Sequence, residues 1–317
     1  MIYADSSFFE WLMNMLRGLR EIRTPFLDGS MSVITLLGQE ALFIVAAEII
    51  FYCINKKAGY KFLFMFYVGM LFNQILKFIF KIPRPWMIDP EFEIVESARS
   101  GATGWSFPSG HTQSAAMMYL GLANELKKRW AYFAAGALVL LIAFSRIYLG
   151  VHTLLDVSAA LILGVLVLVL VEMLFKKFGE RKGFVTLIYG AAAVSSLIFL
   201  IIVLGSDKTS EVYLDDVKTA ASIFGLACGA CCGSWLEERY VKFEVEAVWW
   251  MQIIKVVLGL AIILGIKEAL KPLLGLISDS PLMSAPRYFV MILAAIAVYP
   301  IAFRVLNLIG RVKARQK

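Results

Sequence analysis

Long apolar runs separated by short polar segments extend along nearly the whole chain. Most of these runs approach the length of about 20 residues that an α-helix needs to cross a bilayer. The pattern therefore predicts an all-α fold, a polytopic bundle of membrane helices. We place nine helices near residues 32–54, 59–80, 108–125, 129–150, 152–175, 184–204, 213–234, 249–275 and 286–310.

An amphipathic segment precedes the first of these helices. Residues 6–20 place Phe8, Leu12, Leu16 and Leu19 on one helical face. Such a face is typical of a helix that lies in the membrane interface. An ordinary leader helix packed against the bundle explains the pattern equally well.

The helix predicted at 108–125 is too polar to cross a bilayer alone. Its apolar stretch covers only residues 115–123, and small or polar residues at 109–114 precede it. Polar groups at membrane depth are tolerated only where they face protein or a water-filled cavity. We therefore expect this helix inside the bundle, with its polar end in a solvated site.

Composition supports the membrane assignment. The chain has 317 residues, of which 60% are hydrophobic and 17% charged, whereas average soluble domains have roughly 45–50% apolar and about 25% charged residues. The net charge of +7 comes without a basic run interleaved with aromatic residues. We therefore expect no nucleic-acid partner.

Three of the four cysteines, Cys228, Cys231 and Cys232, gather on one predicted helix. A structural zinc site needs four ligands at a supporting spacing, and both histidines of the chain are better used elsewhere. We interpret the cysteines as small packed thiols, and we expect neither a metal site nor a disulfide framework.

Basic residues gather at alternate turns of the predicted bundle, and the positive-inside rule assigns such turns to the cytoplasm. With nine crossings, the amino terminus then lies outside and the carboxyl terminus inside. The opposite side receives the loop at 81–107, which is either a lid or a plain external loop. The basic groups are Lys56, Lys57 and Lys61; Lys127, Lys128 and Arg129; Lys176, Lys177, Arg181 and Lys182; and Arg311, Lys313, Arg315 and Lys317.

Three polar clusters fall at helix ends on the extracytoplasmic side, and they contain the two histidines of the chain, His111 and His152. His152 and Asp156 are four residues apart, so on a helix they share one face and can touch. A carboxylate behind an imidazole fixes the tautomer and supports positive charge on the ring. This arrangement suits a histidine nucleophile or base.

The other members of the clusters suit a phosphate group. Lys77, Arg84 and Arg146 balance the charge of about −1.5 to −2 on a phosphate monoester. Ser109 and Gly110 begin a helix and offer backbone N–H donors to the same anion. The sequence holds no cluster that resembles a magnesium or zinc site, so we expect metal-independent chemistry without a cofactor.

The order and spacing of these residues resemble those of the type 2 phosphatidic acid phosphatase and haloperoxidase superfamily. The motifs are Lys-x6-Arg-Pro at 77–85, Pro-Ser-Gly-His at 108–111 and Ser-Arg-x5-His-x3-Asp at 145–156. They match the superfamily at every signature position, and the likeness covers roughly residues 33–175. The membrane helices make the chain similar to the lipid-phosphatase branch, because the soluble vanadate-dependent peroxidases lack such helices.

This resemblance implies a role for each motif residue. His152 attacks phosphorus and forms a phosphohistidine, while Asp156 orients its ring. His111 protonates the leaving lipid oxygen and then activates water. The phosphoryl oxygens are held by Lys77, Arg84, Ser109, Gly110 and Arg146.

The amino-terminal part resembles a bacterial subgroup related to sphingosine-phosphate phosphatases, through Gly38-Gln39-Glu40 and residues 52–59. This likeness implies a bacterial cytoplasmic membrane protein and leaves the substrate open. Glu40 lies within the first membrane helix, where acidic residues are costly and often functional. It is a candidate headgroup contact, although a structural pair with Asn73 or Gln74 explains it equally well.

We expect three parts: an interfacial segment at 1–30, a six-helix phosphatase core at 31–204 and about three additional membrane helices at 205–317. In the last part Gly225, Gly229 and Gly233 form a close-packing face. That face serves a helix of the same chain or a homodimer, and packing within the chain is favoured.

The predicted function is a membrane phosphatase that hydrolyses a lipid phosphate or diphosphate at the extracytoplasmic face. Isoprenoid diphosphates, phosphatidate, phosphatidylglycerophosphate and sphingoid phosphates remain open as substrates. One alternative is a lipid phosphotransferase that uses the same phosphohistidine. The other is a non-catalytic lipid-binding or transport protein, which predicts an incomplete motif set, whereas every member is present.

Overall fold

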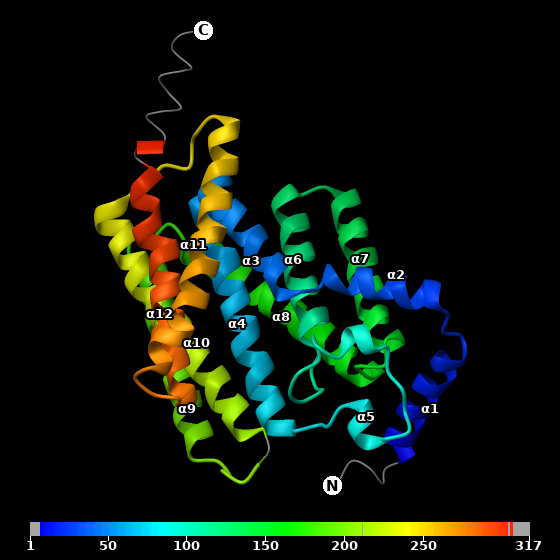
Figure 1. Cartoon of the computed structure of the whole chain (residues 1–317). Coiled ribbons are helices and arrows are strands. Elements are labelled where there is room, and N and C mark those ends of the chain that lie inside the picture. The colour runs from blue at the N-terminus through cyan, green and yellow to red at the C-terminus, as the bar shows by residue number, and fades with distance from the viewer. Residues whose placement is uncertain (1–6, 211, 304, 307–317) are drawn as a thin grey trace. The chain divides into compact units, whose positions relative to one another are not determined.

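The computed structural model describes residues 7–210, 212–303 and 305–306, which form helices and loops with no β-strand among them. The predicted all-α fold is confirmed (Figure 1). The end of the last predicted helix and the basic residues Arg311, Lys313, Arg315 and Lys317 lie outside the described residues. The chain forms two compact units, Met1–Ile44 with Val68–Leu170 and Val45–Tyr67 with Val171–Lys317. The three parts predicted from the sequence remain a prediction.

The first unit contains the predicted chemistry. Its helices are α1 (Ser7–Glu21), α2 (Pro25–Leu36), α5 (Pro85–Ile88), α6 (Gly110–Leu126) and α7 (Arg129–Tyr148), together with the start of α3 (Glu40–Ile49), the second half of α4 (Lys56–Phe80) and most of α8 (Leu154–Phe178).

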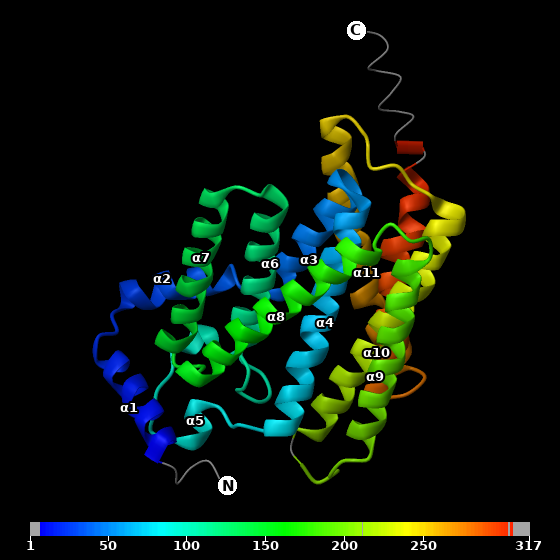
Figure 2. The same ribbon diagram turned by 180° about the vertical axis from the view of Figure 1, so that it is seen from behind.

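Helices α6 and α7 lie side by side as an antiparallel hairpin in both views (Figures 1 and 2). The hairpin turns at Lys127, which adopts a left-handed conformation with φ of 53°. Helix α6 has 17 residues and is buried along most of its length. Gly164 of α8 packs so closely on α6 that an added Cβ would lie 2.9 Å from Ala116. The predicted burial of this short helix is therefore confirmed.

The prediction of a single helix at 32–54 is wrong. The chain breaks at residues 37–39 into α2 and α3, and the two helical segments are bent by 41° relative to each other. Helix α3 continues into a π-helical turn, η1 (Ile50–Ile54). The break is fixed on α6, where the Tyr119 hydroxyl donates to the Leu37 carbonyl over 2.9 Å. These contacts come from distant parts of the chain, so an apolar pattern does not reveal them.

Helix α1 packs against the first unit through Phe9, Leu12, Met13 and Leu16. Phe8, which the sequence places on this face, is 49% exposed instead. The basic side of α1 reaches the loop at 81–107, where Arg17 pairs with Asp89 over 2.7 Å and Arg20 with Glu93 over 2.8 Å. The described contacts are those of a packed leader helix, and its position at a membrane interface remains a prediction.

The loop at 81–107 is held in place by its own apolar side chains. Phe92, Ile94 and Ala98 are buried together with Leu149 and Val151 from the turn between α7 and α8. The short 3₁₀ turn η2 (Glu96–Ala98) lies within this loop. The loop is therefore a packed part of the first unit, and its movement as a lid remains a prediction.

The second unit contains the C-terminal helices α9 (Phe184–Leu204), α10 (Tyr213–Leu236), α11 (Trp249–Gly275) and α12 (Ser284–Leu293). An added Cβ on Gly225 would lie 2.1 Å from the Ala285 carbonyl oxygen of α12, and one on Gly229 would lie 2.6 Å from that of Phe289. The glycine face of α10 therefore packs within the chain, as favoured above. The four cysteines are free thiols.

Within the described ranges, six helices are long and apolar enough to cross a membrane, and a seventh span results if the bent pair α2 and α3 counts as one. Of the nine predicted crossings, those that correspond to α6 and α11 are not among these candidates. The six are Lys56–Ile88, Arg129–Tyr148, Leu154–Phe178, Phe184–Leu204, Tyr213–Val241 and Pro281–Ala302. The chain is an integral membrane protein, as its composition predicts.

Candidate functional site

The three sequence motifs meet at one end of the α6–α7 hairpin in the first unit. Lys77 lies in the last turn of α4, and Arg84 immediately precedes α5. Gly150 turns the chain between α7 and α8 with φ of 79°, a conformation that favours glycine. An added Cβ there would also lie 2.8 Å from Arg23. This turn places His152 just before α8.

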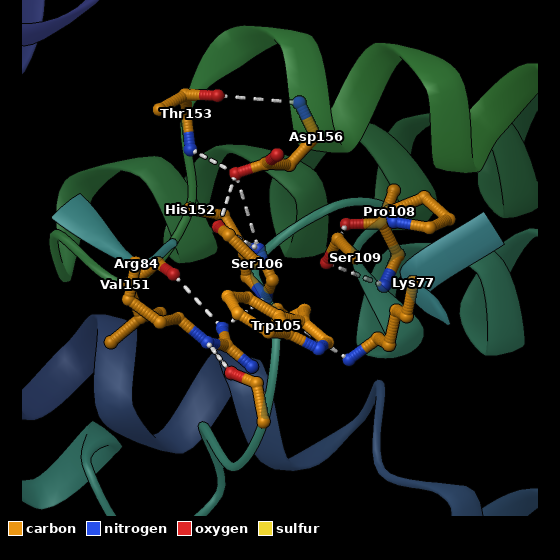
Figure 3. A network of polar contacts seen from close by, with 12 residues as sticks. Lys77, Arg84, Trp105, Ser106, Pro108, Ser109, Val151, His152, Thr153 and Asp156 are labelled. Atoms are coloured by element: carbon orange, nitrogen blue, oxygen red, sulfur yellow. Dashed lines mark hydrogen bonds and ion pairs between the residues drawn. The ribbon is translucent and has the colours of Figure 1, made fainter. Parts of the chain in front are cut away.

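His152 is held on one side by the first turn of α8 and by the 81–107 loop. Its Nδ1 lies 3.4 Å from Asp156 Oδ2 and 3.4 Å from Ser106 Oγ. The same Oδ2 accepts hydrogen bonds from Ser106 Oγ over 2.6 Å and from the Thr153 amide over 2.7 Å (Figure 3). The carboxylate that faces the imidazole is therefore itself fixed by two donors.

Arg84 lies on the other side of the ring. Its Nη1 is 3.0 Å from His152 Nε2. A guanidinium only donates hydrogen bonds, so Nε2 accepts and the ring proton belongs on Nδ1, which faces Asp156. The contacts thus define a neutral tautomer whose Nε2 carries the available lone pair. That nitrogen is the nucleophilic position of the ring.

The other donors of Arg84 go to backbone carbonyls. Nε donates to Gly104 over 3.1 Å, Nη1 to Val151 over 3.0 Å and Nη2 to Thr103 over 2.8 Å. Arg84 thus ties the 81–107 loop to the α7–α8 turn, a role that the sequence does not suggest. The predicted contact of Arg84 with phosphoryl oxygens remains a prediction.

Arg146 differs from Arg84 in its hydrogen bonds. Its side chain is almost fully buried, and Nη1 donates to Thr35 Oγ1 over 2.9 Å. Its Nε and Nη2 have no hydrogen-bond partner among the described residues. An unpartnered buried guanidinium is unfavourable unless a ligand completes it. Arg146 therefore has donors available for an anion.

The start of α6 supplies further donors. The Ser109 amide donates to the Asp156 carbonyl oxygen over 3.1 Å, and Ser109 Oγ accepts from the Thr112 hydroxyl over 3.1 Å. Ser109 is therefore occupied as the N-cap of α6. The amides of Gly110 and His111 lie in the first helical turn, where intrahelical acceptors are lacking. Such amides are suited to an anion.

Lys77 and Glu40 complete the cluster. Lys77 Nζ donates to the Trp105 carbonyl over 3.0 Å. Its charge acts on those of Arg84, Arg146, Asp156 and Glu40. Glu40 Oε1 lies 3.8 Å from the position that a Cβ on Gly110 would take. The alternative pairing of Glu40 with Asn73 or Gln74 is not observed among the described residues, and the Asn73 amide donates to Gln113 over 2.7 Å instead.

The two histidines lie close enough to influence each other. Burial lowers the pKa of His152 well below its usual range, and the charges of Arg84, Arg146, Lys77 and His111 lower it further. His111 Nε2 lies 3.8 Å from the Cβ position of Gly101, in the 81–107 loop. All nine residues singled out from the sequence, Glu40, Lys77, Arg84, Ser109, Gly110, His111, Arg146, His152 and Asp156, therefore belong to one cluster in the first unit.

Sequence reasoning missed several members of this cluster. Ser106 contacts both Asp156 and His152, and Thr35 binds Arg146. Ser106 stands between Trp105 and Phe107, two residues before the second motif, and this proximity is its only signal in the sequence. Thr35 carries no signal, because its role depends on the packing of α2 against α7.

The cluster combines an oriented imidazole, a second imidazole, three cations and first-turn amides around one small region. These groups are suited to nucleophilic attack on phosphorus and to stabilising the charge that develops on its oxygens. Within the described ranges, no group of three or more His, Cys, Asp or Glu side chains is arranged to hold a metal ion.

Comparison with known proteins agrees with this chemistry. Residues 58–180 match the PAP2 superfamily, and residues 221–313 match the transmembrane extension of PAP2 superfamily phosphatases. Phosphatidylglycerophosphatase B of Bacillus subtilis is 32% identical over 169 residues, which cover 48% of this chain and 76% of that protein.

Two further relatives carry other names. Sphingosine-1-phosphate phosphatase 1 of Rattus norvegicus is 26% identical over 63% of this chain and 46% of its own length. Undecaprenyl-diphosphatase of Sulfolobus acidocaldarius is 27% identical over 44% of this chain and 66% of its own length. The match to most of the Bacillus phosphatase, together with the two matched segments, shows that the chain belongs to the PAP2 superfamily.

Proposed function

We propose that this protein is a membrane phosphatase that hydrolyses lipid phosphates through a phosphohistidine. The orientation of His152 supports the proposal best. Asp156 and Ser106 face its Nδ1, and Arg84 donates to its Nε2. The nitrogen that would attack phosphorus is therefore already deprotonated and directed away from the carboxylate.

In the first step, Nε2 of His152 attacks phosphorus, a nitrogen–phosphorus bond forms and the bond to the lipid oxygen breaks. Arg84 must release Nε2 as the phosphoryl group arrives. Arg146 and the amides of Gly110 and His111 bind the phosphoryl oxygens. Protonated His111, which a bound phosphate dianion favours, donates its proton to the leaving lipid oxygen.

In the second step, neutral His111 takes a proton from water, and the hydroxide that results attacks phosphorus. The nitrogen–phosphorus bond breaks, and its electron pair returns to Nε2 of His152. Inorganic phosphate leaves, and both imidazoles recover their initial state. Asp156 stabilises the positive charge on His152 throughout and keeps the ring proton on Nδ1. We propose no metal ion or cofactor in either step.

We further propose that the site faces the extracytoplasmic side. The chemical cluster lies where α6 begins and α7 ends, whereas Lys127, Lys128 and Arg129 lie at the opposite end of this hairpin. Basic turns favour the cytoplasmic side. Both the nine predicted crossings and the seven spans obtained by counting α2 and α3 as one are odd in number, so we propose that the amino terminus is outside and the carboxyl terminus inside, in a bacterial cytoplasmic membrane.

A lipid phosphotransferase is the second candidate, because the same phosphohistidine could pass its phosphoryl group to an alcohol in place of water. The relatives are named for phosphatidylglycerophosphate, sphingosine 1-phosphate and undecaprenyl diphosphate. Assaying the purified protein with these three lipids separates the candidates, since hydrolysis yields free phosphate and transfer yields a new phosphorylated alcohol.

The same assay tests the mechanism. We expect His152→Ala to abolish turnover and to abolish labelling of the protein by a ³²P-phosphorylated substrate, while the variant remains monodisperse in detergent. Normal turnover in His152→Ala, or turnover that requires an added divalent cation, would falsify the phosphohistidine mechanism. An intact wild type that binds these lipids without turnover would support a non-catalytic protein instead.

A further inference from the structure

Glu40 is an acidic side chain near the anion-binding groups that the proposed mechanism does not use. Helix α3 begins at Glu40, directly after the break at 37–39. Gly38 in this break fits against α6, since an added Cβ would lie 3.1 Å from the His111 carbonyl oxygen and 2.7 Å from Ile142. The position of Glu40 relative to the start of α6 is therefore set by close backbone packing.

The carboxylate of Glu40 borders the space in front of Gly110. Among the described residues, its Oε1, 3.8 Å from the Cβ position of Gly110, is the only atom of another segment within 4 Å of that position. Gly110 and His111 supply the first-turn amides that suit a phosphoryl group. Glu40 therefore lies at the edge of the place where the phosphate would bind.

Glu40 is also available to a ligand. Its side chain is only partly covered by other residues of the chain, and in the part of the chain that the structure describes its carboxylate forms neither a hydrogen bond nor an ion pair. The charge of Lys77 acts on it from a distance. A carboxylate so placed only accepts hydrogen bonds, as a phosphate does, and two such anions repel each other.

This repulsion becomes an attraction when the substrate carries a cation beside its phosphate. An ammonium group on the carbon next to the phosphorylated carbon can reach a carboxylate at the edge of the phosphate site. A hydroxyl at that carbon offers a weaker, uncharged hydrogen bond, and an acylated oxygen offers none. We therefore expect substrate binding to be strongest with the ammonium group, weaker with the hydroxyl and weakest with the acylated oxygen.

We propose that Glu40 makes the site select lipid phosphate monoesters that carry an ammonium group on the carbon next to the phosphorylated carbon. This inference rests on the proposed phosphatase activity. Long-chain amino-alcohol phosphates have this chemistry. Phosphatidate, whose corresponding oxygen is acylated, meets only the repulsion from Glu40.

The test compares kcat/KM of the full-length protein in mixed micelles on three substrates: sphinganine 1-phosphate with its ammonium, lysophosphatidate with its hydroxyl, and phosphatidate with neither. We expect the wild type to prefer them in this order. In Glu40→Gln, which keeps size but loses charge, we expect the ratio of sphinganine 1-phosphate to phosphatidate to fall at least tenfold. Glu10→Gln, on the exposed side of α1, is the matched control and should leave the ratio unchanged.

A purely structural role for Glu40 would lower both activities together, so an unchanged ratio in a folded Glu40→Gln protein overturns the proposal. If that variant does not fold, Glu40→Asp decides, because it keeps the charge. Retained preference for the ammonium substrate in Glu40→Asp supports the proposal, and a folded, active variant without that preference overturns it. Absence of phosphate release from all three lipids by the wild type would instead refute the phosphatase function on which this inference rests.

Discussion

The two sides of the proposed catalytic cluster differ in how far their hydrogen-bond donors are satisfied, although one acceptor on the side of His152, Asp156 Oδ1, also lacks a partner among the described residues. On the side of His152, Asp156 Oδ2 accepts two hydrogen bonds, and Arg84 uses its donors on Nε2 and three carbonyls. On the side of His111, Arg146 keeps two nitrogen atoms without a partner among the described residues. Both sides are built from motif residues, so the difference lies in their surroundings.

In the proposed mechanism, the first side holds the nucleophile in a fixed position and the second side leaves donors free to bind the anion. Groups whose positions are fixed before the substrate binds need no reorganisation during the reaction. Donors without partners in the free protein gain most from a bound phosphate, because the cost of leaving them unpaired then disappears. Substitutions on the two sides should therefore affect different kinetic constants.

The largest expected effect is on the fixed side. We expect Asp156→Asn to lower kcat by roughly 10³- to 10⁴-fold with KM little changed, because the ring of His152 loses its preferred tautomer. Steady-state kinetics on a lipid phosphate checks this, with circular dichroism as the control for folding. A variant whose loss is mainly in KM would break the comparison, since Asp156 would then act on the anion site.

A smaller effect is expected on the open side. Arg146→Ala should lower kcat/KM by roughly 10²- to 10³-fold, the usual cost of removing a donor to a transition-state oxygen. The loss should include weaker inhibition by inorganic phosphate, which Asp156→Asn should leave intact. Arg146→Lys should recover only a small part of the lost kcat/KM, since a lysine cannot supply two donors in one plane. Unchanged phosphate inhibition in Arg146→Ala would count against an open anion site.

The smallest effect concerns pH and the stability of the fixed side. Burial and neighbouring cations lower the pKa of His152 in the folded protein. The unfolded chain therefore binds the proton more readily, so this residue stabilises the fold above pH of about 6.5 and loses that contribution as pH falls. A histidine that stays neutral would cost about 2 kcal/mol of stability at pH 5.

Thermal unfolding in detergent at pH 7 and pH 5 measures this dependence. The decrease in Tm between the two pH values should be smaller in His152→Gln than in the wild type, because glutamine does not titrate. Equal decreases in the two proteins would show that His152 has an ordinary pKa, and the fixed side would then be less buried than its contacts indicate.

What could be predicted from the sequence depended on local patterns. Apolar runs located α7 through α10 closely, and the spacing of His152 and Asp156 brought the two side chains together because four residues are about one helical turn. The convergence of the three motifs could be predicted from the alternating direction of successive helices alone.

The features of the fold and of the site that the sequence does not predict depend on contacts between distant segments. The break at 37–39 follows the fit of Gly38 against α6, and Ser106 reaches Asp156 only because the 81–107 loop folds over the α7–α8 turn. Phe9 rather than Phe8 is buried in α1, because Phe9 packs with Ile82 from the 81–107 loop. A single sequence carries no separate signal for such contacts.

The three carbonyl groups held by Arg84 have a consequence for mutagenesis. Lysine at this position would retain the positive charge, but its single nitrogen cannot reach Gly104, Val151 and Thr103 together. Loss of activity in Arg84→Lys would therefore say nothing about phosphate binding, because displacement of these backbone segments alone would abolish activity. One residue both holds the local backbone in place and contacts the proposed nucleophile. An activity assay without a structural measurement would not separate these two roles.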